Sequence, residues 1–211
     1  MKYNFLKKSV LRVSVIFSFS AFTILLLMIL ACTTTRPFLA SKEPAKQYAY
    51  QNGVFVECLY LHFMDMEKRH GHIANPFLPP DLGLTPQQMI VFELTIRNED
   101  DAPIRLDNRQ ISLFYGGRRF APMSASDMER KIEEHAERRF ILREKRVAQT
   151  HMLPSITTIR GNQTVTGYLV FMGGFRDRRE TLAELVLPFT SVGGLPVAEF
   201  TFTYTLTLRH Q

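Results

Sequence analysis

The clearest pattern in the sequence lies near its C-terminal end, where apolar and polar residues alternate. Apolar residues occupy every second position from Ala198 to Leu208, and Glu199 and four threonines occupy the positions between them. Period two sustained over this length, with β-branched residues on the polar side, predicts a strand and has no helical alternative. We expect this strand to place its aromatic row in the core of a β domain.

Shorter runs of the same kind predict further strands. They cover residues 54–63, 90–97, 104–106, 111–115, 118–122, 164–171 and 185–187. The Gly116-Gly117 pair between two of them is typical of a two-residue hairpin, because glycine accepts positive φ at both positions. Four prolines between Met64 and Gln87 predict a long loop. Cys58 falls among the apolar positions of the first run and is expected to be a small buried hydrophobe.

One highly charged segment departs from the β pattern. Ser126-Asp127-Met128-Glu129 fits a capping box, and Met128, Ile132, Ala136 and Phe140 follow at helical spacing. Acidic residues gather in its first half and basic residues in its second half, the order that complements a helix dipole. The sequence therefore predicts one charged helix over about 126–148, inserted between two strands.

The first part of the chain combines a basic start with a long uncharged run from Val13 to Cys32. Four basic residues between Lys2 and Arg12 precede the run, and no acidic residue occurs before the cysteine. A secretory signal has this order with an apolar stretch of roughly 7–15 residues, whereas about 20 apolar residues can span a bilayer. Both a cleaved signal and a retained transmembrane anchor would place the residues after Cys32 on the exported side.

The end of this run favours the cleaved signal. Ile29-Leu30-Ala31-Cys32 resembles the lipobox of bacterial lipoproteins, with a branched apolar residue three positions before the cysteine and a small residue directly before it. The resemblance implies that Cys32 carries a diacylglycerol thioether, that the chain is cut before it and that the new amine is acylated. Thr33 stands where, in enterobacterial members of the family, an aspartate signals inner-membrane retention, so the resemblance favours the outer membrane.

The net charge is much smaller once this N-terminal segment is left out. The chain has 26 basic and 20 acidic residues, and without the four basic residues before Cys32 the balance is 22 to 20. Nucleic-acid binding needs a basic stripe on the folded domain, so we expect no nucleic-acid partner. About 180 residues follow Cys32, enough for one domain with its own core. With Cys32 acylated, Cys58 has no partner for an internal disulfide.

The strands taken together resemble an immunoglobulin-like β-sandwich of the kind common in bacterial lipoproteins of unknown function. The likeness rests on Val91–Asn98, on Ile111 to Gly117, on Gly161, on Gly167–Phe171 and on Leu185 to Pro188. In such domains the glycines mark a turn and the start of a core strand. The family offers no shared catalytic residues.

We therefore expect an all-β fold, an immunoglobulin-like β-sandwich with an inserted charged helix, preceded by an N-terminal signal or anchor helix. The expected organisation is a lipoprotein signal peptide over 1–31, a lipidated tether over 32–51 and the sandwich domain over 52–211.

A histidine-rich stretch is the first candidate for chemistry. His62, His70 and His72 lie near Asp65 and Glu67, and two or three imidazoles with a carboxylate can bind zinc or copper. The charged neighbours favour a solvated turn instead. The sequence contains no G-x-S-x-G, phosphate-binding, dinucleotide-binding or H-E-x-x-H motif. We expect no catalytic residue, no metal and no cofactor.

The second candidate is the basic half of the expected helix. Arg138, Arg139, Arg143 and Arg146, with Lys145, form a cationic cluster. Such a cluster is most often a solvated face, but on an exposed helix it can bind anionic lipid head groups or an acidic protein.

These features predict a lipid-anchored cell-envelope lipoprotein that acts as a non-catalytic structural or protein-interaction module. Its partners would be membrane lipid, through acylated Cys32, and an envelope protein that the sequence does not identify. The alternative is a metal-binding or hydrolytic envelope protein that uses His62, His70 and His72.

Overall fold

The computed structural model describes residues 37–42, 44–78, 88–173 and 180–210. The chain divides into two compact units, Met1–Arg36 with His210–Gln211, and Pro37–Arg209. The second unit is a two-sheet β domain with a helical layer. The expected signal or anchor helix and Cys32 lie outside the described residues. Within those residues, no helix is long and apolar enough to cross a membrane.

Four antiparallel strands form the smaller sheet. Their spatial order is β2 (Lys46–Gln51), β3 (Val54–Leu61), β4 (Gln88–Asn98) and β9 (Thr164–Gly173). Alternate side chains on one face, such as Val56, Leu94 and Leu169, are buried, as period-two patterning requires. The turn between β2 and β3 is Asn52-Gly53, whose residues both have positive φ.

Seven strands form the larger sheet. Five of them follow in the order β1 (Pro37–Ser41), β11 (Pro196–His210), β10 (Thr181–Ser191), β5 (Ile104–Asp107) and β8 (Ile156–Ile159), and β6 (Ser112–Tyr115) pairs with both β10 and β7 (Arg118–Phe120). On the edge away from β11, β10 pairs first with β6 and then with β5. Leu187 and Pro188 lie between these two partners. The strand therefore continues past Pro188, because the missing proline N–H costs no ladder bond on that edge.

The main core lies between the two sheets. Phe200, Phe202, Tyr204 and Leu206 of β11 are buried in it, which confirms the aromatic row expected of the last strand. The Tyr204 hydroxyl donates to the Cys58 carbonyl across the core at 3.1 Å. Cys58 is fully buried, and burial raises the pKa of its thiol to about 12. This confirms the small buried hydrophobe expected at that position.

The segment expected to be a tether is folded from Pro37 onward. β1 lies beside β11, where the Lys42 amide donates to the Thr205 carbonyl at 3.1 Å. Gln47 of β2 donates its side-chain amide to the Thr203 carbonyl at 2.8 Å and joins the two sheets along this edge. Both strands are short edge strands that depend on their neighbours, so their own alternation is too weak to predict them.

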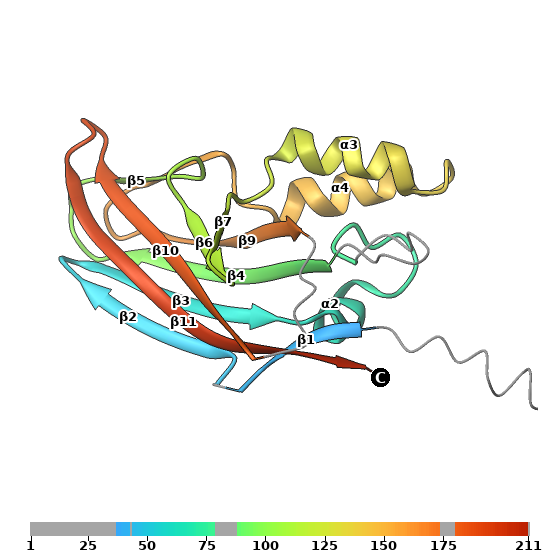
Figure 1. Ribbon diagram of the computed structural model, residues 1–211. Helices are drawn as coiled ribbons and strands as arrows, with labels where there is room; N and C mark the ends of the chain where they lie inside the picture. The colour runs from blue at the N-terminus through green and yellow to red at the C-terminus, as the bar shows by residue number, and fades with distance from the viewer. Residues whose placement is uncertain (1–36, 43, 79–87, 174–179, 211) are drawn as a thin grey trace, which may run out of the picture. The chain divides into compact units, whose positions relative to one another are not determined.

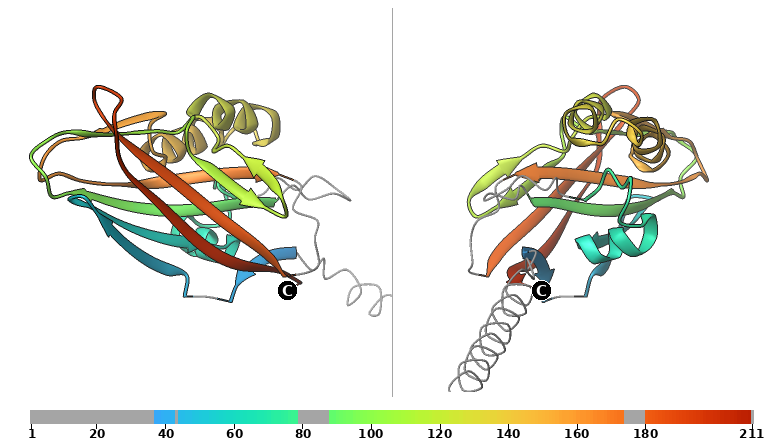
Figure 2. Two further views of the ribbon diagram at one scale, coloured as in Figure 1. Left: turned by 60° about the vertical axis from the view of Figure 1, so that its left-hand side comes forward. Right: turned by 90° about the vertical axis from the view of Figure 1, so that its right-hand side faces the viewer.

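Three helices cover part of the outer face of the smaller sheet: α2 (Phe63–His70), α3 (Ala125–His135) and α4 (Ile141–His151). They form a second hydrophobic cluster with outward-facing residues of β3, β4 and β9, comprising Leu61, Met66, Phe77, Val91, Met123, Met128, Ile132, Ala148, Tyr168 and Val170. Figures 1 and 2 show α3 and α4 on the side of the smaller sheet away from β10 and β11. The domain therefore has three layers: the larger sheet, the smaller sheet and the helices.

The helices differ from the sequence expectation in two respects. α2 occupies the start of the segment expected to be a loop, because His62 and Asp65 form a capping box and Met66 is fully buried. The single helix expected over 126–148 is a hairpin of two helices. Its capping box uses Ser124 and Asp127, rather than Ser126 and Glu129, and α3 ends at His135 because the backbone of Ala136 is extended.

Candidate functional site

The helical hairpin of α3 and α4 packs on the smaller sheet through one side. Met128 and Ile132 of α3 and Ala148 of α4 are buried against the smaller sheet. On the exposed side, Lys145 pairs with Glu133 at 2.5 Å, and Gln149 donates to Glu129 at 3.1 Å. The acidic side chains of α3 are thus used in holding α4 along its length.

The arginines predicted as a binding cluster lie at the free end of this hairpin and on α4. Arg138 and Arg139 are in the turn between the helices, and Arg143 and Arg146 are on α4; all four are exposed. Arg139 donates to Glu137 at 2.8 Å, and its guanidinium lies 4.6 Å from the centre of the Phe140 ring. The other three form no ion pair within the described part of the chain.

Leu142 lies among these arginines and was not predicted as a site residue. It is 80% exposed, more than any other large hydrophobic residue in the ranges that the structure describes. Arg146 stands four positions further along α4, a spacing at which side chains on one helical face become neighbours. We refer to Arg138, Arg139, Leu142, Arg143 and Arg146 as the basic tip. The sequence could have indicated Leu142, because this apolar residue does not fall at the helical spacing of the buried residues in the same segment.

A buried lysine fixes the hairpin to the rest of the domain. Lys131 of α3 is 6% exposed, and its Nζ donates to the carbonyls of Pro76 and Leu78 at 2.5 and 2.9 Å. Burial lowers the pKa of Lys131 to about 8, while Glu144 on α4 acts in the opposite direction. Because the amine is directed at two carbonyl oxygens, its evident role is to fasten the 76–78 segment beneath α3.

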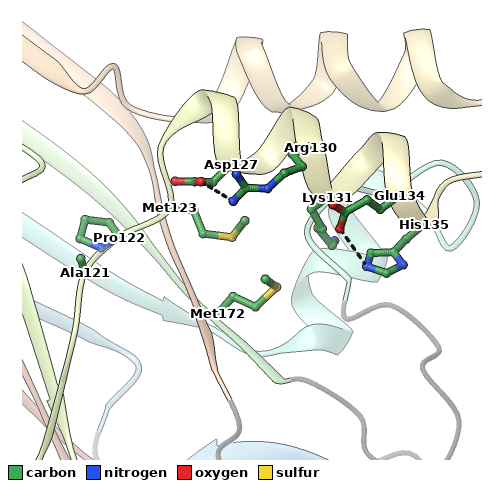
Figure 3. A pocket seen from close by; sticks show the side chains of 9 residues that line it. All are labelled: Ala121, Pro122, Met123, Asp127, Arg130, Lys131, Glu134, His135 and Met172. Atoms are coloured by element: carbon green, nitrogen blue, oxygen red, sulfur yellow. Dashed lines mark hydrogen bonds and ion pairs between the residues drawn. The ribbon is translucent and has the colours of Figure 1, made fainter.

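A cavity of about 390 Å³ lies beside α3 (Figure 3). It is lined by Ala121, Pro122, Met123, Asp127, Arg130, Lys131, Glu134, His135 and Met172. Its charged side chains face one another: Arg130 pairs with Asp127 at 2.7 Å, and His135 lies 3.8 Å from Glu134. A volume of this size can hold a small ligand, but the lining combines two methionines with ion pairs that are already formed.

The structure separates the three histidines proposed as metal ligands. His62 caps α2, and its Nδ1 accepts from the Met64 amide at 3.2 Å. His72 pairs with Glu67 at 2.7 Å, while His70 packs against the sheet. Across the described ranges, no group of three or more His, Cys, Asp or Glu residues is placed to hold a metal ion.

His70 instead belongs to an aromatic and polar cluster that the sequence did not indicate. Its ring centre lies 4.7 Å from that of His151, and its Nε2 is 3.2 Å from the Tyr168 hydroxyl. Arg69 donates both to this hydroxyl, at 3.3 Å, and to Glu93, at 2.8 Å. Burial, then His151 and Arg69, lowers the pKa of His70. These residues are distant in the sequence, so no local pattern could bring them together.

Comparisons with known proteins do not assign the chain to a family. No family model and no curated protein matches the sequence. Among solved structures, it is similar to a Bacillus subtilis chain described as a "putative lipoprotein (ycdA)", with a TM-score of 0.44 and 14% sequence identity. The match covers 78% of this chain and 39% of that chain, so this chain spans about two fifths of its neighbour's length.

Proposed function

We propose that this protein is a lipid-anchored cell-envelope lipoprotein whose domain is an immunoglobulin-like, non-catalytic interaction module. The observation that carries the proposal is the order of the first 32 residues: a basic start, an uncharged apolar run, a small residue and then Cys32. Two or more acyl chains on that cysteine would hold the protein stably on a membrane, whereas one chain binds reversibly.

A non-catalytic role is supported by the polar side chains, because several of them already form structural contacts. His62 caps a helix, His72 pairs with Glu67, and Lys131 donates to two backbone carbonyls. A general base or nucleophile would need a free group within hydrogen-bond reach of its partner. We assign partner contact to the basic tip, whose arginines are exposed.

The location that we propose is the exported side of a bacterial membrane. The basic residues that precede the apolar run favour the cytoplasmic side and so direct the following chain outward. Thr33 after the cysteine favours the outer membrane over the inner one, by resemblance to enterobacterial lipoproteins.

Metabolic labelling with a clickable fatty acid tests this proposal, because the chain has two cysteines in different settings. The wild type and Cys58→Ala should take up the label and sediment with membranes, and Cys32→Ala should lose the label. Cys58→Ala is the matched control, since that thiol is buried in the core. Labelling that survives Cys32→Ala, or a wild type that is never labelled, would remove the basis of the proposal.

A further inference from the structure

The folded domain begins a short distance from the proposed lipid attachment. Cys32 and Pro37 are five residues apart, and an extended chain spans at most about 3.3–3.6 Å per residue, or about 18 Å in all. β1 starts at Pro37. If Cys32 is acylated, as the proposed function states, the N-terminal end of β1 is held close to the bilayer surface.

The basic tip lies at the same end of the domain as the start of β1. In Figure 1 both the free end of the α3–α4 hairpin and the N-terminal end of β1 are on the right, and the right-hand view of Figure 2, which faces that end, shows the hairpin at its top and β1 at its bottom. The turns between β4 and β5 and between β10 and β11 lie at the opposite end. A bilayer that lies against this end of the domain would face both the start of β1 and the free end of the hairpin.

The basic tip and the turn after β4 carry charges of opposite sign. Arg138, Arg143 and Arg146 at the near end have no ion-pair partner in the part of the chain that the structure covers. At the far end, the turn after β4 carries three consecutive exposed acidic residues, Glu99–Asp101. An anionic membrane attracts basic residues near its surface, by about 1 kcal/mol each, and repels acidic ones. This polarity suits a domain whose hairpin faces the lipid.

Leu142 adds an apolar contact at the centre of the basic tip. Its side chain is 80% exposed, whereas a helix face that only contacts solvent usually carries polar side chains. Basic residues around an exposed apolar side chain are the arrangement with which surface helices bind the boundary between head groups and acyl chains. The arginine stems can lie along that boundary while their guanidinium groups reach the phosphates.

We propose that the basic tip is a second membrane-contact site, which binds anionic phospholipid and fixes how the domain is oriented on the membrane. Acyl chains on Cys32 would hold the protein in place, and the tip would limit rotation of the domain relative to the membrane. A membrane is favoured over an acidic protein partner because the short connection already brings this end of the domain close to lipid.

A fluorescent label at position 142 tests this inference. Full-length protein carrying Leu142→Cys is extracted from bacterial membranes in its acylated form, labelled with bimane and reconstituted into vesicles that contain a spin-labelled quenching lipid. The introduced thiol should be the one that reacts, because Cys58 is fully buried with a pKa raised to about 12. Leu195→Cys is the matched control, because Leu195 is 71% exposed in the turn between β10 and β11 at the opposite end.

In vesicles with phosphatidylglycerol, the label at 142 should shift to the blue and be quenched, and the label at 195 should do neither. Arg143→Glu in the Leu142→Cys background should abolish the quenching, as should high salt, which screens surface charge. Arg160→Glu, an exposed arginine in the turn after β8, makes the same charge change and should leave the quenching intact.

Equal quenching at 142 and 195, or quenching unaffected by Arg143→Glu, would overturn the membrane contact. So would an unquenched label at 142 that cross-links to an envelope protein in cells, which would assign the tip to a protein partner. Failure of the wild type to float with vesicles would count against the lipid anchor itself, and intact flotation with no difference between the two labels counts against the tip alone.

Discussion

The two faces of the smaller sheet are buried in different ways. Its inner face packs on the larger sheet through a continuous row of apolar side chains, of which Phe92 and Phe171 are fully buried. Its outer face packs against the helices around Val91 and Val170, and beyond them it carries Thr95 and Thr166, whose hydroxyls lie 3.1 Å apart. The main core between the sheets, here called the inner cluster, therefore supports the whole fold. The second hydrophobic cluster under the helices, here called the outer cluster, holds only the helical layer.

This difference indicates where the domain can vary without losing its structure. A helical layer attached to one half of one face can present new groups, such as the basic tip, while the two-sheet core stays unchanged. Binding residues are commonly carried by insertions on a rigid scaffold. The following predictions test whether the two clusters are separable in this way.

Truncation in the inner cluster should have the largest effect. Phe202 is 2% exposed, and Phe→Ala in a core costs roughly 3–5 kcal/mol through lost burial and an unfilled cavity. We expect Phe202→Ala to lower the free energy of unfolding by about that amount across the entire domain. Denaturant unfolding followed by circular dichroism measures it, and a loss below about 1 kcal/mol would show that β11 is not central to the core.

Truncation in the outer cluster should be smaller and local. Ile132 of α3 is 1% exposed, and Ile→Ala at a buried site costs roughly 2–5 kcal/mol. We expect Ile132→Ala to fall at the low end of that range and to raise hydrogen exchange in α3 and α4 while β10 and β11 stay protected. Equal loss of protection in the sheets would show that the two clusters unfold as one.

Acid should weaken the larger sheet through Asp107. Arg109 donates to this carboxylate from Nε at 3.1 Å and from NH2 at 2.8 Å. These bonds lower the pKa of Asp107 to about 2, well below its usual value. A lowered folded-state pKa stabilises the fold fully above about pH 4, and the contribution is lost as pH falls towards 2.

The loss should be on the order of 1 kcal/mol, since Arg109 is largely exposed and solvent screens the pair. Asp107→Asn should remove this pH dependence and lower stability at pH 7, as measured by denaturant unfolding at several pH values. An unchanged acid transition in Asp107→Asn would exclude this carboxylate as its source.

Mild acid should loosen the helical layer first, with the smallest effect. The pKa of His70 is lowered by burial and by His151 and Arg69, so the folded state binds this proton less readily than the unfolded chain. The stability that it contributes is therefore complete above about pH 6.5 and declines as pH falls below it. Hydrogen exchange at pH 7 and pH 5.5, expressed as protection factors because intrinsic exchange itself slows as pH falls, should show lower protection in α2 and α4 at pH 5.5, with the larger sheet unchanged. His70→Phe should reduce that difference, and a variant that keeps all of it would place the sensitivity elsewhere.

The sequence predicted the inner cluster well and the outer layer poorly, for a physical reason. Period-two alternation reports the side chains on both faces of one strand, so β4, β9 and β11 could be predicted from their own residues. β1 and β8 could not, because short edge strands depend on partners distant in the sequence. β2 could not because its six residues are mostly exposed, although its partner β3 follows directly in the chain. Alternation also could not indicate that Pro188 is tolerated, since that depends on the gap between β5 and β6.

The candidate sites divide in the same way. The arginines of the basic tip were predicted because a cluster in sequence stays a cluster along one hairpin. The histidines were not resolved by sequence, because His62, His70 and His72 look adjacent but serve a helix cap, an aromatic cluster and an ion pair. His151 and Tyr168, which share the cluster with His70, lie about 80 and 100 positions further along the chain.

The intact mass of the membrane-extracted protein, measured beside that of Cys32→Ala, tests the central claim most directly. A lipid anchor predicts a wild-type mass equal to the chain from Cys32 onward plus acyl groups, and loss of that species in the variant. An unprocessed full-length mass for both proteins would contradict the claim, because the apolar run would then be a retained transmembrane anchor and Cys32 would carry no lipid.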